Sequence, residues 1–258
     1  FEKASLRTRI SFYLAIRQLG GSALTLRPEE IHLKKGNESF ADSAKIISSS
    51  SDVFMLRTDS DKKLDKLKNF LDIPLINGLS PNGHPTQILS DIFTIEEIKK
   101  KNINKLNICW VGDSNNVLNS LIEASVKFSF KLNISCPIKY KPNNNLLIWA
   151  KNNKAKIKIF NNPQKAVKGA DVLLTDKVIS LNDKLDKLKK LKAFRNFRIS
   201  AKLLKFAKKN CNILHCLPRG DEIDENVFNS KNSKIWLQAS NRVHVQKSIL
   251  LYCLDKLR

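Results

Sequence analysis

Apolar residues along the chain follow two patterns in turn. Some segments repeat them with a helical period, which is typical of a helix that buries one face, and others are short continuous apolar runs, which are typical of buried parallel strands. In the first part of the chain, the predicted helices are 7–19, 39–48, 62–71 and 86–101, and the predicted strands are 22–26, 53–57 and 73–76.

The alternation continues to the end of the chain. The predicted strands are 107–111, 131–135, 156–160, 171–175 and 211–215, and the predicted helices are 117–129, 144–152, 184–194, 200–209 and 241–257. Strands that alternate with helices predict an α/β protein in which central parallel sheets are flanked by helices. With 258 residues, 42% of them hydrophobic, the chain can bury two such cores, and we place their boundary after the polar stretch 99–105.

The charge balance is strongly basic, with 46 Lys and Arg against 24 Asp and Glu and a formal net charge of +22. Such a charge suggests a nucleic-acid partner, because basic faces bind phosphate backbones. The lysines, however, are spread over nearly every predicted helix, and no RNP-like aromatic strand or zinc-finger spacing accompanies them. We interpret them as solvated surface and expect no nucleic-acid partner.

Cysteine usage and hydropathy indicate the compartment. The five cysteines are an odd number without a C-x-x-C pair, so the sequence predicts neither a disulfide framework nor a metal site, and a reducing cytoplasm fits best. An apolar run of about 18 residues and a signal peptide are both absent, so we expect no membrane association. The sequence starts at Phe1, inside an expected strand or loop, and we expect it to be a fragment.

The most informative motif is HCLPRG at 215–220, directly after the predicted strand 211–215. Ligands of α/β proteins bind beyond the carboxyl ends of the strands, so a thiol, an imidazole and a guanidinium at this point predict a site. A thiol in an electropositive site ionises readily, which makes Cys216 a candidate nucleophile. A role for Cys216 in binding is the alternative.

A second motif, Ser5 to Arg9, lies where a helix begins. Hydroxyls, guanidinium groups and the free N–H groups of the first helical turn can converge on one anion, and arginine donates two parallel hydrogen bonds to a phosphate. The motif therefore predicts a phosphate site. Taken alone, however, the motif is better explained as a serine cap followed by a basic first turn.

A third motif, His84 to Gln87, again precedes a helix. His84 and Gln87 can donate hydrogen bonds to a carbonyl or phosphate oxygen, while Pro85 presets the turn. A capping histidine is the structural alternative. Arg57 ends the predicted strand 53–57 and, on sequence alone, could be an ordinary exposed arginine.

Seven motifs in chain order together resemble the aspartate/ornithine carbamoyltransferase family. They are 5–8 (family S-T-R-T), Arg57-Thr58, 84–87 (H-P-[CT]-Q), 112–116 (G-D-x-N-N), 176–180 (D-x-x-x-S), 215–219 (H-C-L-P-R) and Asn241-Arg242 (N-R). The aspartate branch carries Pro where Cys216 stands, so Cys216 indicates the ornithine branch.

This resemblance implies a fold, an assembly and an activity. It implies a carbamoyl-phosphate-binding domain at 1–103 that lacks its first helix and strand, an ornithine-binding domain at 104–240, and a final helix, 241–258, that packs back on the first domain. It further implies transfer of the carbamoyl group of carbamoyl phosphate to the δ-amine of L-ornithine, giving citrulline and phosphate for arginine biosynthesis. The family needs no cofactor and forms homotrimers with sites at subunit interfaces.

The resemblance also assigns roles to residues. Carbamoyl phosphate is assigned to Ser5, Leu6, Arg7, Thr8, Arg57, His84, Gln87, Cys216, Leu217 and Arg242, of which Arg57, His84, Cys216 and Arg242 are the catalytic group. Ornithine is assigned to Asn116, Asp176, Ser180 and Leu181. In this scheme the Cys216 thiol and the Leu217 carbonyl face the δ-amine, so Cys216 positions an amine instead of attacking.

Departures from the family pattern leave alternatives open. Leu6 replaces a Thr of the phosphate loop, Ser180-Leu181-Asn182 replaces S-M-G, and His32 replaces a Gln in a loop that reaches a neighbouring subunit in the family. Another acceptor amine such as putrescine, or a catalytically weakened paralogue, therefore remains possible on sequence alone. Asp176 and Ser180 favour an acceptor with an amino-acid head.

Overall fold

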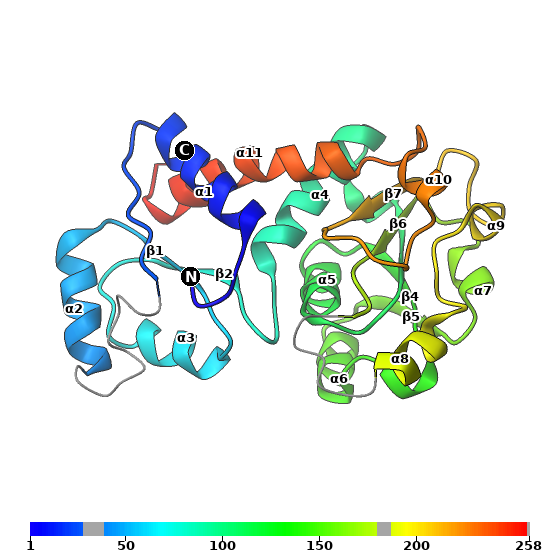
Figure 1. The fold of residues 1–258 in the computed structure, drawn as a ribbon, viewed down its shortest axis with the longest axis horizontal. Coiled ribbons are helices and arrows are strands. Elements are labelled where there is room, and N and C mark those ends of the chain that lie inside the picture. Colours follow the sequence, from blue (N-terminus) through cyan, green and yellow to red (C-terminus); the bar gives the residue numbers. More distant parts are fainter. Residues whose placement is uncertain (28–38, 180–186, 257–258) are drawn as a thin grey trace. The chain divides into compact units, whose positions relative to one another are not determined.

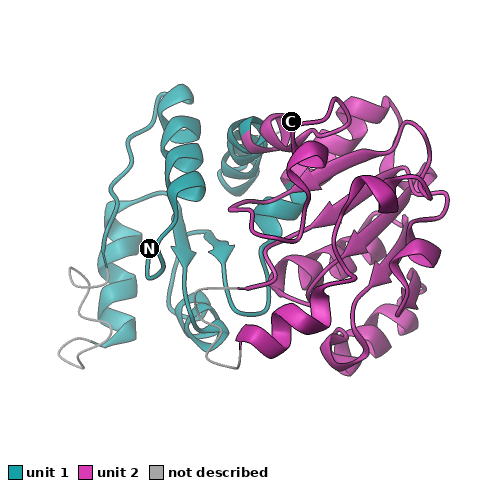
Figure 2. Ribbon diagram, turned by 45° about the vertical axis from the view of Figure 1, so that its right-hand side comes forward, with its two compact units in different colours: residues 1–89, 240–258 teal, residues 90–239 magenta. Residues whose placement is uncertain are grey.

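The computed structural model describes residues 1–27, 39–179 and 187–256, and it is an α/β protein (Figure 1). The chain divides into two compact units, Phe1–Leu89 with Ser240–Arg258, and Ser90–Ala239 (Figure 2). The division falls inside two helices, α4 (Pro85–Lys99) and α11 (Ile235–Cys253). The domain limits that the family resemblance implies, at residues 103 and 240, stay a prediction.

The first unit is built on a pair of parallel strands, in which Phe54 lies opposite Leu75. Its elements up to the second of these strands are, in chain order, α1 (Leu6–Gln18), α2 (Phe40–Ser50), β1 (Phe54–Arg57), α3 (Asp61–Lys68) and β2 (Leu75–Leu79). Phe12 of α1, Ile76 of β2 and Leu250 of α11 share one apolar cluster. The C-terminal part of α11 therefore packs on the first unit, as the family resemblance implied.

The second unit has a five-stranded sheet in the order β5-β4-β3-β6-β7, and all its strands are parallel. The strands are β3 (Asn107–Val111), β4 (Lys131–Ser135), β5 (Lys156–Phe160), β6 (Val172–Thr175) and β7 (Asn212–His215). The helices are α5 (Asn116–Lys127), α6 (Asn144–Asn152), α7 (Pro163–Val167), α8 (Lys187–Phe194), α9 (Ala201–Leu204) and α10 (Glu225–Phe228), with short 3-10 turns at Ile103–Lys105 and Ile138–Tyr140.

Helices cover both faces of this sheet, with α5 and α6 on one side and α7 and α9 on the other (Figure 1). Cys109 and Val111 alternate along β3 and join the apolar cluster that contains Ala166 and Val167 of α7. Alternate side chains of a strand point to opposite faces, so β3 contributes to a core on each side. This explains why β3 is apolar and buried from Ile108 to Val111.

Three expectations about elements are wrong, and two short helices were missed. Segment 22–26 is not a strand, 200–209 is helical only over α9, the last helix begins at Ile235 instead of Asn241, and the short α7 and α10 were not expected. After α9, the N–H groups of Phe206 and Ala207 bond three residues back, to Leu203 and Leu204, so the chain tightens into turns. Ile235 is only 1% exposed, and its burial favours the earlier start of α11.

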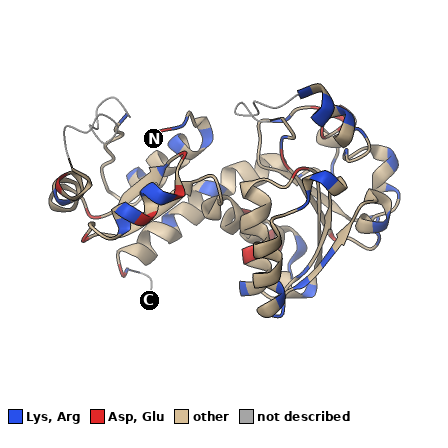
Figure 3. Ribbon diagram, turned by 90° about the horizontal axis from the view of Figure 1, so that it is seen from below, with Lys and Arg blue, Asp and Glu red and all other residues tan. Residues whose placement is uncertain are grey.

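Lys and Arg residues are spread along the chain in both units, many of them on helices (Figure 3). This distribution agrees with solvated surface lysine. Within the described parts of the chain, none of the helices is both long enough and apolar enough to pass through a membrane.

Candidate active site

The first unit gathers buried polar side chains around Thr8. The Thr8 hydroxyl accepts a hydrogen bond from Arg242 Nη2 at 2.7 Å and a longer one from Arg57 Nη1 at 3.4 Å. Arg242 Nη1 also donates to Gln87 Oε1 at 2.6 Å. We call Thr8, Arg57, His84, Gln87 and Arg242 the anion cluster, because two guanidinium groups converge there with neutral donors.

His84 precedes α4, and its backbone carbonyl accepts from the N–H groups of Gln87 and Ile88 at the start of that helix. The side chain is buried, and Nδ1 lies 3.4 Å from the Thr86 hydroxyl. Burial, followed by the positive charges of Arg242, Arg57 and Arg7, holds the pKa of His84 well below its ordinary value of 6.5. His84 is therefore neutral at pH 7 and can donate an N–H without carrying a charge.

The start of α1 adds anion-binding groups beside this cluster. Ser5 caps the helix, because its hydroxyl accepts from the Thr8 N–H at 3.3 Å, and the first turn holds no acidic residue. The free N–H groups of a helix start favour a negative charge. Arg7 lies in this turn, whereas the Leu6 side chain is 70% exposed and only its backbone can bind an anion.

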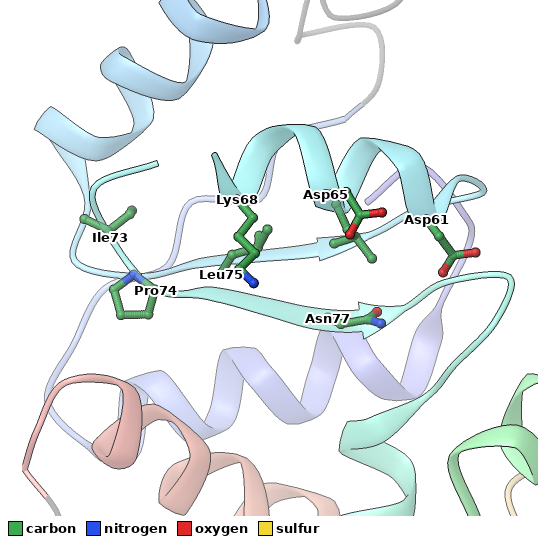
Figure 4. A pocket seen from close by; sticks show the side chains of 8 residues that line it. Asp61, Asp65, Lys68, Ile73, Pro74, Leu75 and Asn77 are labelled. Atoms are coloured by element: carbon green, nitrogen blue, oxygen red, sulfur yellow. The ribbon is translucent and has the colours of Figure 1, made fainter. Parts of the chain in front are cut away.

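A separate pocket of about 500 Å³ lies beside α3 and β2 of the first unit (Figure 4). Its lining residues are Asp61, Leu64, Asp65, Lys68, Ile73, Pro74, Leu75 and Asn77. The carboxylates of Asp61 and Asp65 would repel a phosphate dianion. The pocket is therefore less suited to an anion than the cluster around Thr8 is.

In the second unit, polar groups lie beyond the ends of β3, β6 and β7, which are neighbours in the sheet. Asp176 follows β6 and accepts two hydrogen bonds, from Asn115 Nδ2 at 2.6 Å and from the Cys216 thiol at 2.8 Å. We call Asn115, Asp176 and Cys216 the acceptor cluster. Because the thiol donates to a carboxylate, it carries its proton in this arrangement, which argues against a nucleophilic thiolate.

The His215 side chain lies behind the acceptor cluster and is fully buried. Nε2 is 2.8 Å from Glu222 Oε1, and Nδ1 accepts from the Leu217 N–H at 2.9 Å. Burial raises the pKa of Glu222, but the hydrogen bonds from His215 and from the Gly220 N–H outweigh it, so the pKa is lowered from its ordinary value. Glu222 is therefore an ionised acceptor for both donors.

The structure brings some predicted residues together and leaves others untested. Asn116 is the first residue of α5, whereas its neighbour Asn115 makes the contact with Asp176. Ser180 and Leu181 lie outside the described residues, as does His32. None of the five cysteines forms a disulfide, and in the described part of the chain no group of three or more His, Cys, Asp and Glu side chains could hold a metal ion.

Two residues that contribute to the acceptor side were missed by sequence reasoning. On sequence alone, Asn115 is one member of the 112–116 motif with no role of its own, and Glu222 has no predicted role. The Asn115 amide could have been found, since an Asn that caps a helix with its oxygen still has a nitrogen to donate. Glu222 has no local signal, because only its burial distinguishes it from other glutamates.

Comparison with known proteins identifies the family. Residues 1–97 match the family model described as aspartate/ornithine carbamoyltransferase, carbamoyl-P binding domain, and residues 104–253 match the one described as aspartate/ornithine carbamoyltransferase, Asp/Orn binding domain. The chain belongs to the aspartate/ornithine carbamoyltransferase family. The matches cover both units. Thr8, Arg57, His84 and Gln87 of the anion cluster fall in the segment that the family model names by carbamoyl phosphate. Arg242 and the acceptor cluster fall in the segment named by Asp/Orn.

Individual members of the family are similar over almost the whole chain. The ornithine carbamoyltransferase of Nitrobacter winogradskyi is 39% identical over 256 residues, which are 98% of this chain and 82% of that protein. The one from Methanococcus vannielii is 43% identical, over 98% of this chain and 85% of that protein. The solved ornithine carbamoyltransferase of Pyrococcus furiosus has a TM-score of 0.92 at 37% identity, covering 99% of this chain and 83% of that one.

Proposed function

We propose that the chain transfers the carbamoyl group of carbamoyl phosphate to the δ-amine of L-ornithine, giving citrulline and phosphate, a step of arginine biosynthesis. Ornithine carbamoyltransferases from several organisms are about 40% identical to it over nearly its full length. The observation that carries the proposal is the contact between the Cys216 thiol and Asp176. It joins the residue that distinguishes the ornithine branch to a carboxylate that suits the α-amino group of an amino acid.

The anion cluster is the proposed site of the carbamoyl donor. Carbamoyl phosphate is a dianion with an electrophilic carbonyl, and Ser5, Arg7, Thr8, Arg242 and the N–H of Leu6 are suited to its phosphate. The guanidinium groups of Arg7 and Arg242 offset the negative charge of the phosphate, which would be unfavourable to bury without a partner. These groups also stabilise the phosphate as it leaves.

Arg57, His84 and Gln87 are the proposed donors to the carbamoyl carbonyl. Negative charge builds on this oxygen as the amine attacks, and donors that are held in place beforehand stabilise it most. Gln87 accepts from Arg242 through Oε1, which makes its NH₂ group the donor end. His84 is neutral and buried, so its N–H polarises the carbonyl without adding a fourth cation to three arginines.

The acceptor cluster is the proposed site of ornithine. Asp176, Asn116 and the undescribed Ser180 are assigned to the amino-acid head, and Cys216 and the Leu217 carbonyl to the δ-amine. Leu181, also undescribed, is assigned to ornithine as an apolar contact. An alkyl amine has an ordinary pKa of about 10 and must lose a proton before it can attack. The new C–N bond then forms as the C–O bond to phosphate breaks, so no covalent enzyme intermediate and no cofactor are required.

A colorimetric assay for ureido products tests this function. The chain is incubated with carbamoyl phosphate and, in separate reactions, L-ornithine, putrescine or L-aspartate. We expect citrulline from ornithine and little product from the other two. If only putrescine gave a product, putrescine and not ornithine would be the acceptor amine. If none of the three amines gave a product, the proposed enzymatic function would be rejected.

We also propose a cytoplasmic homotrimer with sites at subunit interfaces. Leu6, Ile10 and Tyr13 share one face of α1, and their side chains are 70%, 49% and 51% exposed. An exposed apolar face beside a polar site is typical of a protein interface. The five free thiols are compatible with a reducing compartment.

A further inference from the structure

The segment that carries Cys216 and Leu217 has an unusual backbone. Leu217 has a φ of 58°, in the left-handed region that residues other than glycine, asparagine and aspartate seldom occupy. Such a conformation is energetically unfavourable and persists only where surrounding contacts hold it. The direction of the Leu217 carbonyl therefore depends on groups outside the residue.

His215 supplies one of these contacts. Its Nδ1 accepts the Leu217 N–H at 2.9 Å, which requires that Nδ1 carry no proton. Its Nε2 lies 2.8 Å from Glu222 Oε1, where it acts as the donor. The two hydrogen bonds together select one ring tautomer and orientation.

Glu222 also contacts backbone groups in addition to the His215 ring. Its Oε1 accepts from the Gly220 N–H at 2.5 Å, and its Oε2 lies 3.5 Å from the Val178 N–H, which belongs to the segment after β6 that begins with Asp176. The Glu222 side chain is 2% exposed. Its backbone is anchored as well, because its carbonyl accepts from the Ile199 N–H at 2.8 Å.

The absence of a side chain at Gly220 leaves room for the Glu222 carboxylate. A Cβ atom at residue 220 would lie 2.9 Å from Glu222 Oε2, closer than such atoms approach in proteins. The glycine therefore lets the carboxylate reach the backbone of the loop. Any larger residue would have to displace it.

We propose that Glu222 is a positioning residue for the ornithine side of the site. Through His215 it holds Leu217 in its left-handed conformation, and so it sets the carbonyl of Leu217 and the thiol of Cys216 for an ω-amine. This inference rests on the proposed function, since it concerns the acceptor of that reaction. Glu222 touches neither substrate in this scheme and acts only through the loop.

The test compares Glu222→Gln with Glu225→Gln. Glu225 is a surface carboxylate that pairs with Arg219 at 2.6 Å, so its change removes one charge from the same region without touching His215. For Glu222→Gln we expect the KM for ornithine to rise about tenfold and the KM for carbamoyl phosphate to stay within about twofold. Glu225→Gln should match the wild type in both.

Two further variants separate positioning from general stability. Gly220→Ala keeps the charge of Glu222 but displaces its carboxylate, so it should reproduce the ornithine-specific rise even if Glu222→Gln does not fold. Leu217→Asn introduces a residue that tolerates the left-handed region, so Glu222→Gln should raise the KM for ornithine less in that background than in the wild type.

The outcomes are distinguishable. A wild-type chain that makes no citrulline would reject the proposed function and, with it, this inference. If the wild type is active, then folded Glu222→Gln or Gly220→Ala enzymes with a normal KM for ornithine would overturn the inference alone. An equal rise in the KM of both substrates would also overturn it, because it would indicate general loosening.

Discussion

Arg7 and Arg9 stand two positions apart in α1 but differ in their surroundings. The charge of Arg7 contributes to the low pKa of His84, whereas Arg9 is exposed and lies over the ring of Phe1 at 4.9 Å. We expect Arg7→Ala to raise the KM for carbamoyl phosphate by roughly tenfold or more and to lower kcat. Arg9→Ala is the matched control, and steady-state kinetics that fail to separate the two would remove Arg7 from the phosphate site.

The proposed role of Cys216 depends on its hydrogen bond to Asp176. Its thiol donates to Asp176, so we expect Cys216→Ser, which keeps a donor, to retain more turnover than Cys216→Ala. We expect the alanine variant to lose on the order of tenfold in kcat/KM for ornithine with an unchanged thermal midpoint. Cys253→Ala is the control, and full activity of Cys216→Ala would mean that the thiol only fills space.

The buried His84 makes stability depend on pH. Its folded-state pKa lies below the ordinary 6.5, so the unfolded chain binds a proton more readily. Stability from this residue is complete above about pH 6.5 and is lost as the pH falls towards the folded-state pKa, by about 1.4 kcal/mol per pH unit at most. Urea unfolding at pH 7 and pH 5 should show a smaller loss for His84→Gln than for the wild type; equal losses would contradict a neutral His84.

At the scale of elements, the start of α5 combines two tasks in one side chain. Asn115 caps the helix by accepting from the N–H groups of Val117 and Leu118, at 3.0 and 3.2 Å, and its amide nitrogen donates to Asp176. A serine is an equally good cap but cannot make the second contact.

Substitutions of Asn115 can therefore distinguish its effect on the stability of α5 from its effect on the proposed ornithine site. We expect Asn115→Ser to change the free energy of unfolding by less than about 0.5 kcal/mol while raising the KM for ornithine several-fold. Asn115→Asp also caps, but it sets a carboxylate against Asp176 and should raise that KM further. Chemical unfolding and kinetics on the same samples check this, and a serine variant with wild-type kinetics would show that the Asp176 contact is dispensable.

Elements with a strong internal pattern could be predicted closely. The strands 107–111, 131–135 and 156–160 and the helix 144–152 have the predicted limits. Segment 22–26 has an equally strand-like composition, but a strand also needs a neighbouring backbone to pair with. Leu24 is 85% exposed, and composition cannot reveal whether a partner is present.

At the scale of the whole molecule, the exposed face of α1 bears on assembly. We expect the wild-type chain to have a mass of about three times 29.4 kDa by light scattering. Ile10→Asp places a charge in this face and should shift the mass towards one copy. Ile148→Asp on α6, a site of 56% exposure, is the control; a wild-type mass near 29.4 kDa would reject the trimer.

The sequence by itself determined the alternation of strands and helices, the family, and most residues of the proposed site, because periodicity and motifs are local properties of the chain. Only the tertiary structure decided that the ends of β3, β6 and β7 are neighbours, that His84 is buried among arginines, and that Asn115 reaches Asp176. Burial and charge depend on groups that are distant in sequence. For that reason Glu222, whose proposed role depends entirely on such contacts, could be recognised only in the folded chain.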